Sequence, residues 1–167
     1  MSQKLKSQMD DLRKVSDEKF DAVERSSAIA RLRFDGVQDI ESVLVKLLRH
    51  KSFLLRRDAI VTLVGFWHKP DFLNEAFRIL QSDVDESVRS GAAFALGEFA
   101  AQTGNERSQI INKLIKHLMK ETQHPVQEEC YKAVLRIVAP VKMPRTVATN
   151  FNRERDVDWN LLRPYMN

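Results

Sequence analysis

The sequence of 167 residues has few of the residues that cross-link chains or anchor them in membranes. A single cysteine forms no internal disulfide, and because the first residues include no apolar stretch, we expect no signal peptide. The most apolar run, residues 59–67, is too short to cross a bilayer. We therefore expect a cytoplasmic protein that makes no contact with a membrane.

Neither sign of charge dominates the sequence. It holds 27 Lys and Arg residues against 23 Asp and Glu residues in mixed order, which gives a net charge of +4. Mixed charges are typical of a solvated surface, whereas a nucleic-acid footprint needs cations gathered on one face. The charge alone therefore gives little support to nucleic-acid binding.

The sequence also lacks the polar–apolar alternation of period two that marks β-strands. It has only five glycines and five prolines to interrupt regular structure. Apolar residues instead recur with the spacing of a helix face, as at Leu73, Ala76, Phe77 and Leu80. These patterns predict an all-α protein.

One sequence pattern, which we call the phrase, occurs four times along the chain. It begins with a hydrophobic or acidic residue followed by Arg or Gln, with a small residue four positions after the start and an aliphatic residue eight positions after it. The starts lie 31, 33 and 38 residues apart, a spacing typical of helical repeats. The copies are Glu24-Arg25…Ala28…Leu32, Leu55-Arg56…Ala59…Leu63, Val88-Arg89…Ala92…Leu96 and Val126-Gln127…Cys130…Val134.

Each copy of the phrase predicts the inner helix of a pair, and an amphipathic outer helix precedes it. Asp21, Ser52 and Asp85 stand three residues before a copy, where an N-cap side chain satisfies free backbone amides. The expected inner helices lie near residues 17–34, 52–67, 85–103 and 124–139.

The same alignment predicts which side chains fill the core between repeats. Phe66, Phe99 and Ile137 follow the aliphatic position by three residues, so we expect them to stack in one buried layer. Cys130 takes the place of an alanine in the phrase, which predicts an inert core thiol.

The third copy, from Asp83 to Gly97, resembles the HEAT repeat in the short bacterial form also seen in phycobilin-lyase subunits. The resemblance implies a right-handed α-α superhelix, an α-solenoid, of about four helix pairs over residues 1–139. A C-terminal tail over residues 140–167 would hold one short helix, capped by Asp156. This helix either covers the last repeat or docks a partner.

In the HEAT family an Asp before the inner helix and an Arg within it tend to form a ladder between repeats. Asp83 and Arg89 match that pattern, whereas Arg25 and Arg56 keep only the arginine. Gln127 loses the charge altogether. We therefore expect only a partial ladder, with these arginines freer than the resemblance implies.

No catalytic or metal-binding constellation emerges from the sequence. The four histidines fall in separate predicted elements without the spacing of metal ligands, so we expect no enzyme, no metal and no cofactor.

The HEAT resemblance places partners on the concave face that the inner helices form. Arginine and aromatic side chains on such a wall are typical anchors of a protein interface. The candidate partner-binding residues are Arg25, Arg56, Arg57, Trp67, His68, Arg89, Phe94, Tyr131 and Lys132.

Three classes of function fit these observations. We favour a non-catalytic module that binds another protein as an adaptor, regulator, toxin antidote or assembly factor. The alternatives are a nucleic-acid-binding protein with a basic concave stripe, and a lyase or chaperone for a tetrapyrrole-bearing protein. The last rests only on the repeat subtype, and repeat cores specify a fold and not a function.

Overall fold

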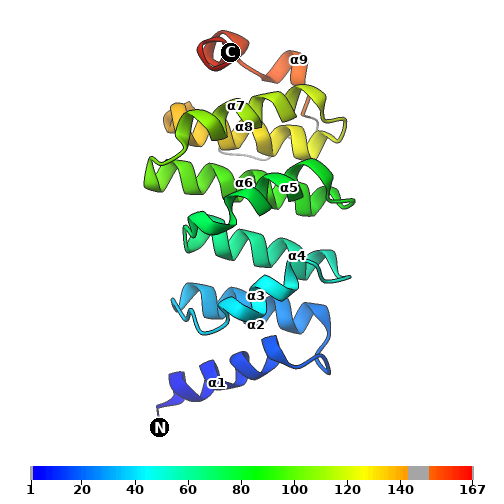
Figure 1. Ribbon diagram of the computed structural model, residues 1–167, viewed down its shortest axis with the longest axis vertical. Coiled ribbons are helices and arrows are strands. Elements are labelled where there is room, and N and C mark those ends of the chain that lie inside the picture. Colours follow the sequence, from blue (N-terminus) through cyan, green and yellow to red (C-terminus); the bar gives the residue numbers. More distant parts are fainter. Residues whose placement is uncertain (1, 143–150, 167) are drawn as a thin grey trace.

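The computed structural model describes residues 2–142 and 151–166 of the chain, and over these residues it is helical and has no strand. The all-α prediction is confirmed. Residues 143–150 and 167 of the predicted tail, and residue 1, lie outside the described residues. The helices follow one another along the long axis, from α1 at one end to the C-terminal segment at the other (Figure 1).

Most helices fall into two alternating sets. Those that precede a copy of the phrase are α1 (Gln3–Ser16), α3 (Glu41–Leu47), α5 (Leu73–Ser82) and α7 (Arg107–Lys120). Those that carry a copy are α2 (Ala22–Phe34), α4 (Phe53–Ile60) with the π-helical η1 (Val61–Phe66), α6 (Glu86–Thr103) and α8 (His124–Val138). The shorter elements are η2 (Pro70–Phe72), η3 (Pro140–Lys142), α9 (Arg153–Asp156), α10 (Trp159–Leu162) and η4 (Arg163–Tyr165).

The helix starts follow the predicted N-caps. Asp21 accepts hydrogen bonds from the amides of Val23 and Glu24, so α2 begins at Ala22 and the predicted start at residue 17 is wrong. Asp85 caps α6 in the same way. Ser52 takes the N-cap position of α4 but makes no capping hydrogen bond with its side chain. A left-handed Gly104, with φ of 72°, ends α6.

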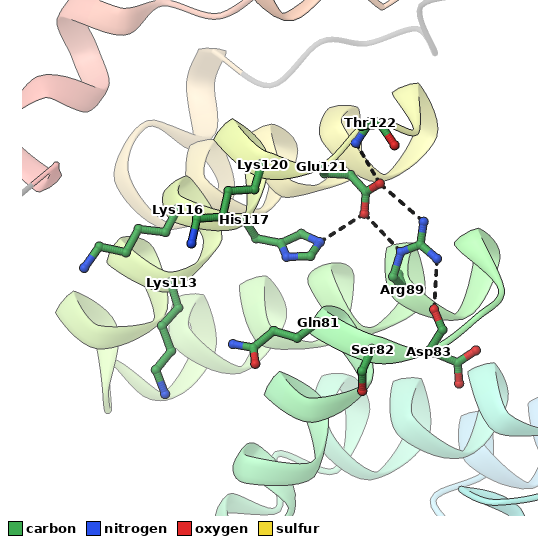
Figure 2. A pocket seen from close by; sticks show the side chains of 10 residues that line it. All are labelled: Gln81, Ser82, Asp83, Arg89, Lys113, Lys116, His117, Lys120, Glu121 and Thr122. Atoms are coloured by element: carbon green, nitrogen blue, oxygen red, sulfur yellow. Dashed lines mark hydrogen bonds and ion pairs between the residues drawn. The ribbon is translucent and has the colours of Figure 1, made fainter.

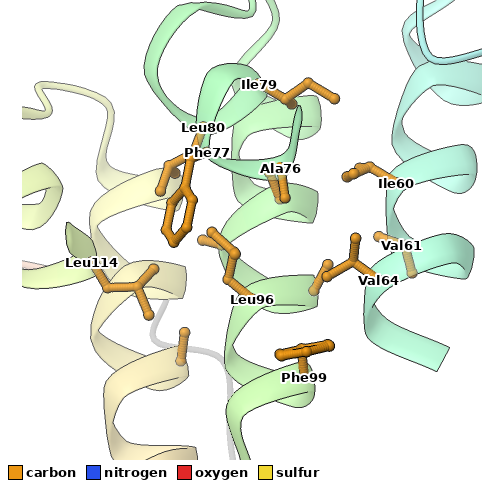
Figure 3. Close-up of a cluster of buried hydrophobic side chains, with 14 of the residues drawn as sticks. Ile60, Val61, Val64, Ala76, Phe77, Ile79, Leu80, Leu96, Phe99 and Leu114 are labelled. Carbon is orange, nitrogen blue, oxygen red and sulfur yellow. The ribbon is translucent and has the colours of Figure 1, made fainter. Parts of the chain in front are cut away.

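The phrase-bearing helices contact one another in chain order, α2 with α4, α4 with α6 and α6 with α8. Each also packs against the helix that precedes it. Figure 3 shows the result around α6, where Leu96 and Phe99 lie among side chains of the neighbouring helices. Leu63 and Leu96 are fully buried. Each aliphatic position of the phrase therefore fills the core between successive helices.

Phe66 departs from the predicted core layer. Phe99 and Ile137 are buried as expected, but Phe66 is 38% exposed. The cause is η1, in which backbone hydrogen bonds span five residues, as from the Trp67 amide to the Thr62 carbonyl. Successive residues of a π-helix advance by a smaller angle than in an α-helix, so Phe66 turns away from the face that carries Leu63.

The segment after residue 150 packs on the end of the helix stack. Leu162 is fully buried, and the guanidinium of Arg153 donates to the carbonyls of Leu118 and Met119 at 3.3 and 2.7 Å. The predicted cap at Asp156 is wrong, because Asp158 caps α10 by accepting a hydrogen bond from the Leu161 amide. The described part of the tail thus covers α7 and α8 at the end of the helix stack.

We expect Leu63→Ala and Leu96→Ala each to lower the free energy of unfolding by roughly 2–5 kcal/mol, because each empties a site in the core between helices. Chemical denaturation measures the loss. Val84→Ala is the matched control, since Val84 is 92% exposed and should change stability little. Near-equal midpoints for all three variants would show that the assigned packing is wrong.

Candidate functional site

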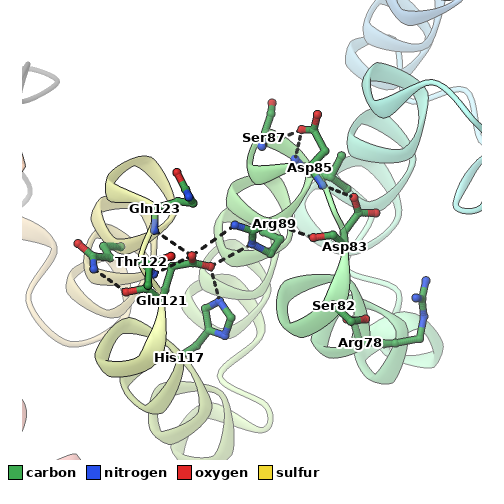
Figure 4. Close-up of polar contacts among 12 residues, drawn as sticks. Arg78, Ser82, Asp83, Asp85, Ser87, Arg89, His117, Glu121, Thr122 and Gln123 are labelled. Atoms are coloured by element: carbon green, nitrogen blue, oxygen red, sulfur yellow. Dashed lines mark hydrogen bonds and ion pairs between the residues drawn. The ribbon is translucent and has the colours of Figure 1, made fainter.

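The second residue of the phrase forms a chain of ion pairs between successive repeats. Arg56 binds the Asp83 carboxylate through two hydrogen bonds of 2.8 Å, and Arg89 binds Glu121 at 3.0 and 3.3 Å. Figure 4 shows Arg89 between Glu121 and the Asp83 carbonyl, to which it also donates at 2.9 Å. Gln127 repeats the backbone contact by donating to the Glu121 carbonyl.

This ladder runs between repeats as expected, since each arginine pairs with the acid of the next repeat. It differs from the expected ladder because Arg56 also has an acid partner. The acids, Asp83 and Glu121, stand five residues before their own phrase. In the second repeat that position holds His50, which gives Arg25 no carboxylate to pair with there. The guanidinium of Arg25 donates instead to the Val15 carbonyl at 3.2 and 3.0 Å. Burial, together with the nearby charge of Arg25, lowers the pKa of His50.

Three predicted site residues are therefore structural in this fold. Arg25 is only 5% exposed, which contradicts the expectation that it lies outside the core. Arg56 and Arg89 are paired and largely buried, so the expectation that Arg56 lacks an acid partner is also wrong.

Glu121 is the most strongly held acid of the ladder. Burial alone would raise its pKa, but hydrogen bonds from the Gln123 amide, Arg89 and the Thr122 amide outweigh burial and lower the pKa to about 2. His117 approaches the same carboxylate at 3.1 Å (Figure 4). Glu121 thus stays charged at neutral pH and joins α7, α6 and the start of α8.

Tyr131 is buried beneath the tail and does not lie on an open wall as predicted. Its hydroxyl accepts a hydrogen bond from the Asp158 amide at 3.1 Å, and its ring lies 6.3 Å from that of Phe151. The reason is its place in the phrase, because the equivalent positions in the other copies hold buried Ile29, Ile60 and Ala93.

Trp67 and His68 follow η1 in a turn in which His68 adopts a left-handed φ of 50°. Trp67 packs against the core and is half-buried. Neither residue lines the pocket that contains Arg57 and Phe94. The structure therefore separates these two predicted site residues from the other candidates.

Arg57 and Phe94 do come together, in a cavity of about 380 Å³ that we call the inner groove. It runs across the helices that carry the phrase. A smaller adjoining cavity, of about 320 Å³, shares Arg57 and includes Lys132, whose ammonium pairs with Glu128 at 2.7 Å. The inner groove is lined by Arg33, Arg57, Asp58, Val61, Phe66, Ser90, Gly91, Phe94 and Glu129.

A row of phenylalanines runs from Phe34, beside the inner groove, to Phe66 and Phe94, which line it. The ring centres of Phe34 and Phe66 lie 5.9 Å apart, and those of Phe66 and Phe94 lie 6.5 Å apart. Arg33 stacks 4.2 Å from the Phe66 ring, and Arg136 stacks 4.9 Å from the Phe94 ring. The row presents aromatic and cationic surface together.

Several buried groups of the inner groove lack a hydrogen-bond partner or a charge that fully offsets their burial. Burial raises the pKa of Asp58 and of Glu129, despite arginines close to both carboxylates. The Nε atom of Arg33 and the hydroxyl of Ser90 are buried without a hydrogen-bond partner among the described residues. Such groups are uncommon in folded proteins and call for an explanation.

Arg57 is the exposed cation of the groove. Its side chain crosses Gly91 so closely that a Cβ atom there would lie 2.8 Å from its Cγ. No hydrogen bond or ion pair of its guanidinium appears within the described part of the chain. The groove can therefore offer an aromatic wall and an available guanidinium to a ligand.

The sequence reasoning missed part of the groove. It named Arg57, Phe94 and Lys132 as binding residues, but neither Glu129 nor the aromatic row. Residues two, six and ten places after the start of a phrase share one helix face. Extending the count to the tenth place would therefore have found Phe34 and Arg136. The position of Phe66 in the groove could be predicted only by knowing that Val61–Phe66 form a π-helix.

Metal chemistry gains no support from the described residues. Within residues 2–142 and 151–166, no group of three or more His, Cys, Asp or Glu residues could hold a metal ion. Cys130 is fully buried, and burial raises the pKa of its thiol.

Among the described helices, none combines the length and apolar character needed to cross a membrane.

Comparison with known proteins places the chain in no family, since no family model, no curated protein and no solved structure matches it significantly. The account of the site therefore rests on the geometry of the chain itself.

Alanine substitution of the adjacent residues Arg56 and Arg57 should lower the free energy of unfolding by different amounts. Arg56→Ala leaves the buried Asp83 carboxylate unpaired, so we expect it to cost on the order of 3 kcal/mol of unfolding free energy. Arg57→Ala removes an exposed side chain and should cost less than about 1 kcal/mol. Urea denaturation of the two variants measures the difference, and equal losses would contradict the assignment of roles.

Proposed function

We propose that the chain is a small α-solenoid of HEAT-like helix pairs that binds a partner protein along the inner groove and catalyses no reaction. The solenoid part is supported by two observations. Phrase-bearing helices contact one another in order, and each is backed by the helix before it. The Arg56–Asp83 and Arg89–Glu121 pairs join successive repeats, as the HEAT resemblance implies.

The observation that carries the binding proposal is the inner groove itself. Phe34, Phe66 and Phe94 form a row on three successive repeats, and Phe34 is 76% exposed. Exposed aromatic and arginine side chains are the usual anchors of protein interfaces.

Adaptors, regulators, toxin antidotes and assembly factors would all use such a groove in the same way. Side chains held on packed helices lose little conformational entropy on binding, which favours affinity without a large interface. The cytoplasmic location expected from the sequence stays a prediction.

The geometry gives less support to the two alternative functions than to protein binding. A basic stripe for nucleic acid would need Arg25, Arg56 and Arg89, and all three are engaged within the fold. Acidic side chains also line the groove, where phosphates would meet Asp58 and Glu129. A lyase or chaperone role for tetrapyrrole-bearing proteins still rests on the repeat subtype alone.

Photo-crosslinking in the source cells tests the proposal. A benzoylphenylalanine in place of Phe34, whose ring contacts the groove residue Phe66, should crosslink the partner. One in place of Phe53, which is also exposed but lies outside both the groove and the aromatic row, should not. Once the partner is identified, Arg57→Ala with Phe34→Ala should weaken the complex by about tenfold or more, as expected for two anchors.

The matched control is Arg49→Ala with Phe53→Ala, which removes the same residue types from outside the groove. It should leave affinity unchanged within about twofold. A partner that crosslinks from Tyr165 and not from Phe34 would contradict the proposal and identify the tail as the docking element.

A further inference from the structure

A second and larger cavity lies on the other set of helices, between the end of α5 and the face of α7. It is open to solvent and encloses about 640 Å³, and we call it the outer pocket (Figure 2). Every residue that lines it is polar or charged. The lining residues are Gln81, Ser82, Asp83, Arg89, Lys113, Lys116, His117, Lys120, Glu121 and Thr122.

The outer pocket has an excess of positive charge. Its two carboxylates are already neutralised, Asp83 by Arg56 and Glu121 by Arg89. Lys113, Lys116 and Lys120 lie on one side of α7, and across the described residues none of them pairs with a carboxylate (Figure 2). Three cations therefore face the pocket without a counter-ion from the chain.

Lys113 is held in place by an aromatic contact. Its ammonium lies 3.8 Å from the centre of the Phe77 ring, a cation–π contact that leaves its charge uncompensated. Lys116 and Lys120 extend into solvent and can move toward a bound anion.

The equivalent cavity one repeat earlier shows that this excess does not follow from the fold. That cavity, of about 390 Å³, lies where α3 and α5 end. Its Arg78 pairs with Glu75 at 2.7 Å, Arg49 approaches the same carboxylate at 3.8 Å, and Arg56 pairs with Asp83. The chain thus neutralises most of the cations in one cavity and leaves three unpaired in the next.

We propose that the outer pocket binds an oligophosphate, a chain of two or more linked phosphate groups, either free or as part of a nucleotide. Lys113 and Lys120 are seven residues apart, which is about 10 Å along a helix and more than one phosphate group spans. Ammonium groups act as compact point charges with three donors, which suits phosphate oxygens. Gln81 and Thr122 add neutral polar groups at the edge of the pocket. This site is independent of the inner groove.

Isothermal titration of the full chain with tripolyphosphate, without divalent cations, tests the proposal. We expect binding that weakens as salt is added and that falls by about tenfold or more in Lys113→Gln/Lys116→Gln/Lys120→Gln. The matched control, Lys6→Gln/Lys19→Gln/Lys46→Gln, changes the net charge equally at exposed sites elsewhere and should alter affinity by less than about twofold.

Two further ligands distinguish the source of the phosphates. ATP with the same affinity as tripolyphosphate would show that the phosphate chain alone is recognised, whereas tighter binding of ATP would identify a nucleotide. Both results support the pocket. Inorganic phosphate should bind at least about tenfold more weakly than tripolyphosphate, because it reaches fewer lysines.

Backbone amide shifts in NMR spectra locate the ligand. Tripolyphosphate should shift the amides of residues 113–122 and leave those of Arg57 and Phe94 unchanged. Failure of both tripolyphosphate and ATP to bind would overturn the proposal. So would an equal loss of affinity in the control variant, or shifts centred on the inner groove.

Discussion

The structure depends on the close packing of each phrase-bearing helix between two others. α6 contacts α4 and η1 on one side and α8 on the other, and α5 lies across it. The approach to α8 is possible because of Gly97, where a Cβ atom would lie 2.8 Å from the Cβ of Ala133. Small residues such as Ala92 and Ala93 are fully buried in the same helix. This packing fixes the rotation of every helix, and so decides which side chains reach the inner groove.

Adjacent residues of the phrase therefore have different roles. The second residue, as in Arg56 and Arg89, lies near the loop before its helix and binds both that loop and the acid of the next repeat. The third residue, as in Arg57, lies on the inner groove. The ladder uses the charge of the arginines that a basic concave stripe would need. It also fixes the edge of the outer pocket, since Asp83 and Glu121 are neutralised there and the lysines of α7 are not.

Much of the fold could be predicted from the sequence, because helix period, N-caps and a repeated phrase are local signals. The all-α class, the caps at Asp21 and Asp85 and the buried positions of Leu63 and Leu96 followed from them. The exposure of Phe66 could not be predicted, since the phrase assumes α-helical rotation and η1 changes it. The burial of Tyr131 could have been inferred from its position in the phrase, but its cover by the distant residues Phe151 and Asp158 could not. The groove and the outer pocket depend on which repeats lie side by side, and local patterns do not encode this.

Native-state hydrogen exchange tests the central claim, that stability comes from packing each phrase-bearing helix between its neighbours. Helices enclosed on several sides should open only with the whole protein, whereas a terminal helix can open alone. We predict that the amides of α6 exchange with an opening free energy close to that of global unfolding. Those of α1, where Leu5 and Met9 are exposed, should exchange through local opening at a much lower free energy. Equal opening free energies in α1 and α6, or weaker protection in α6, would contradict the account.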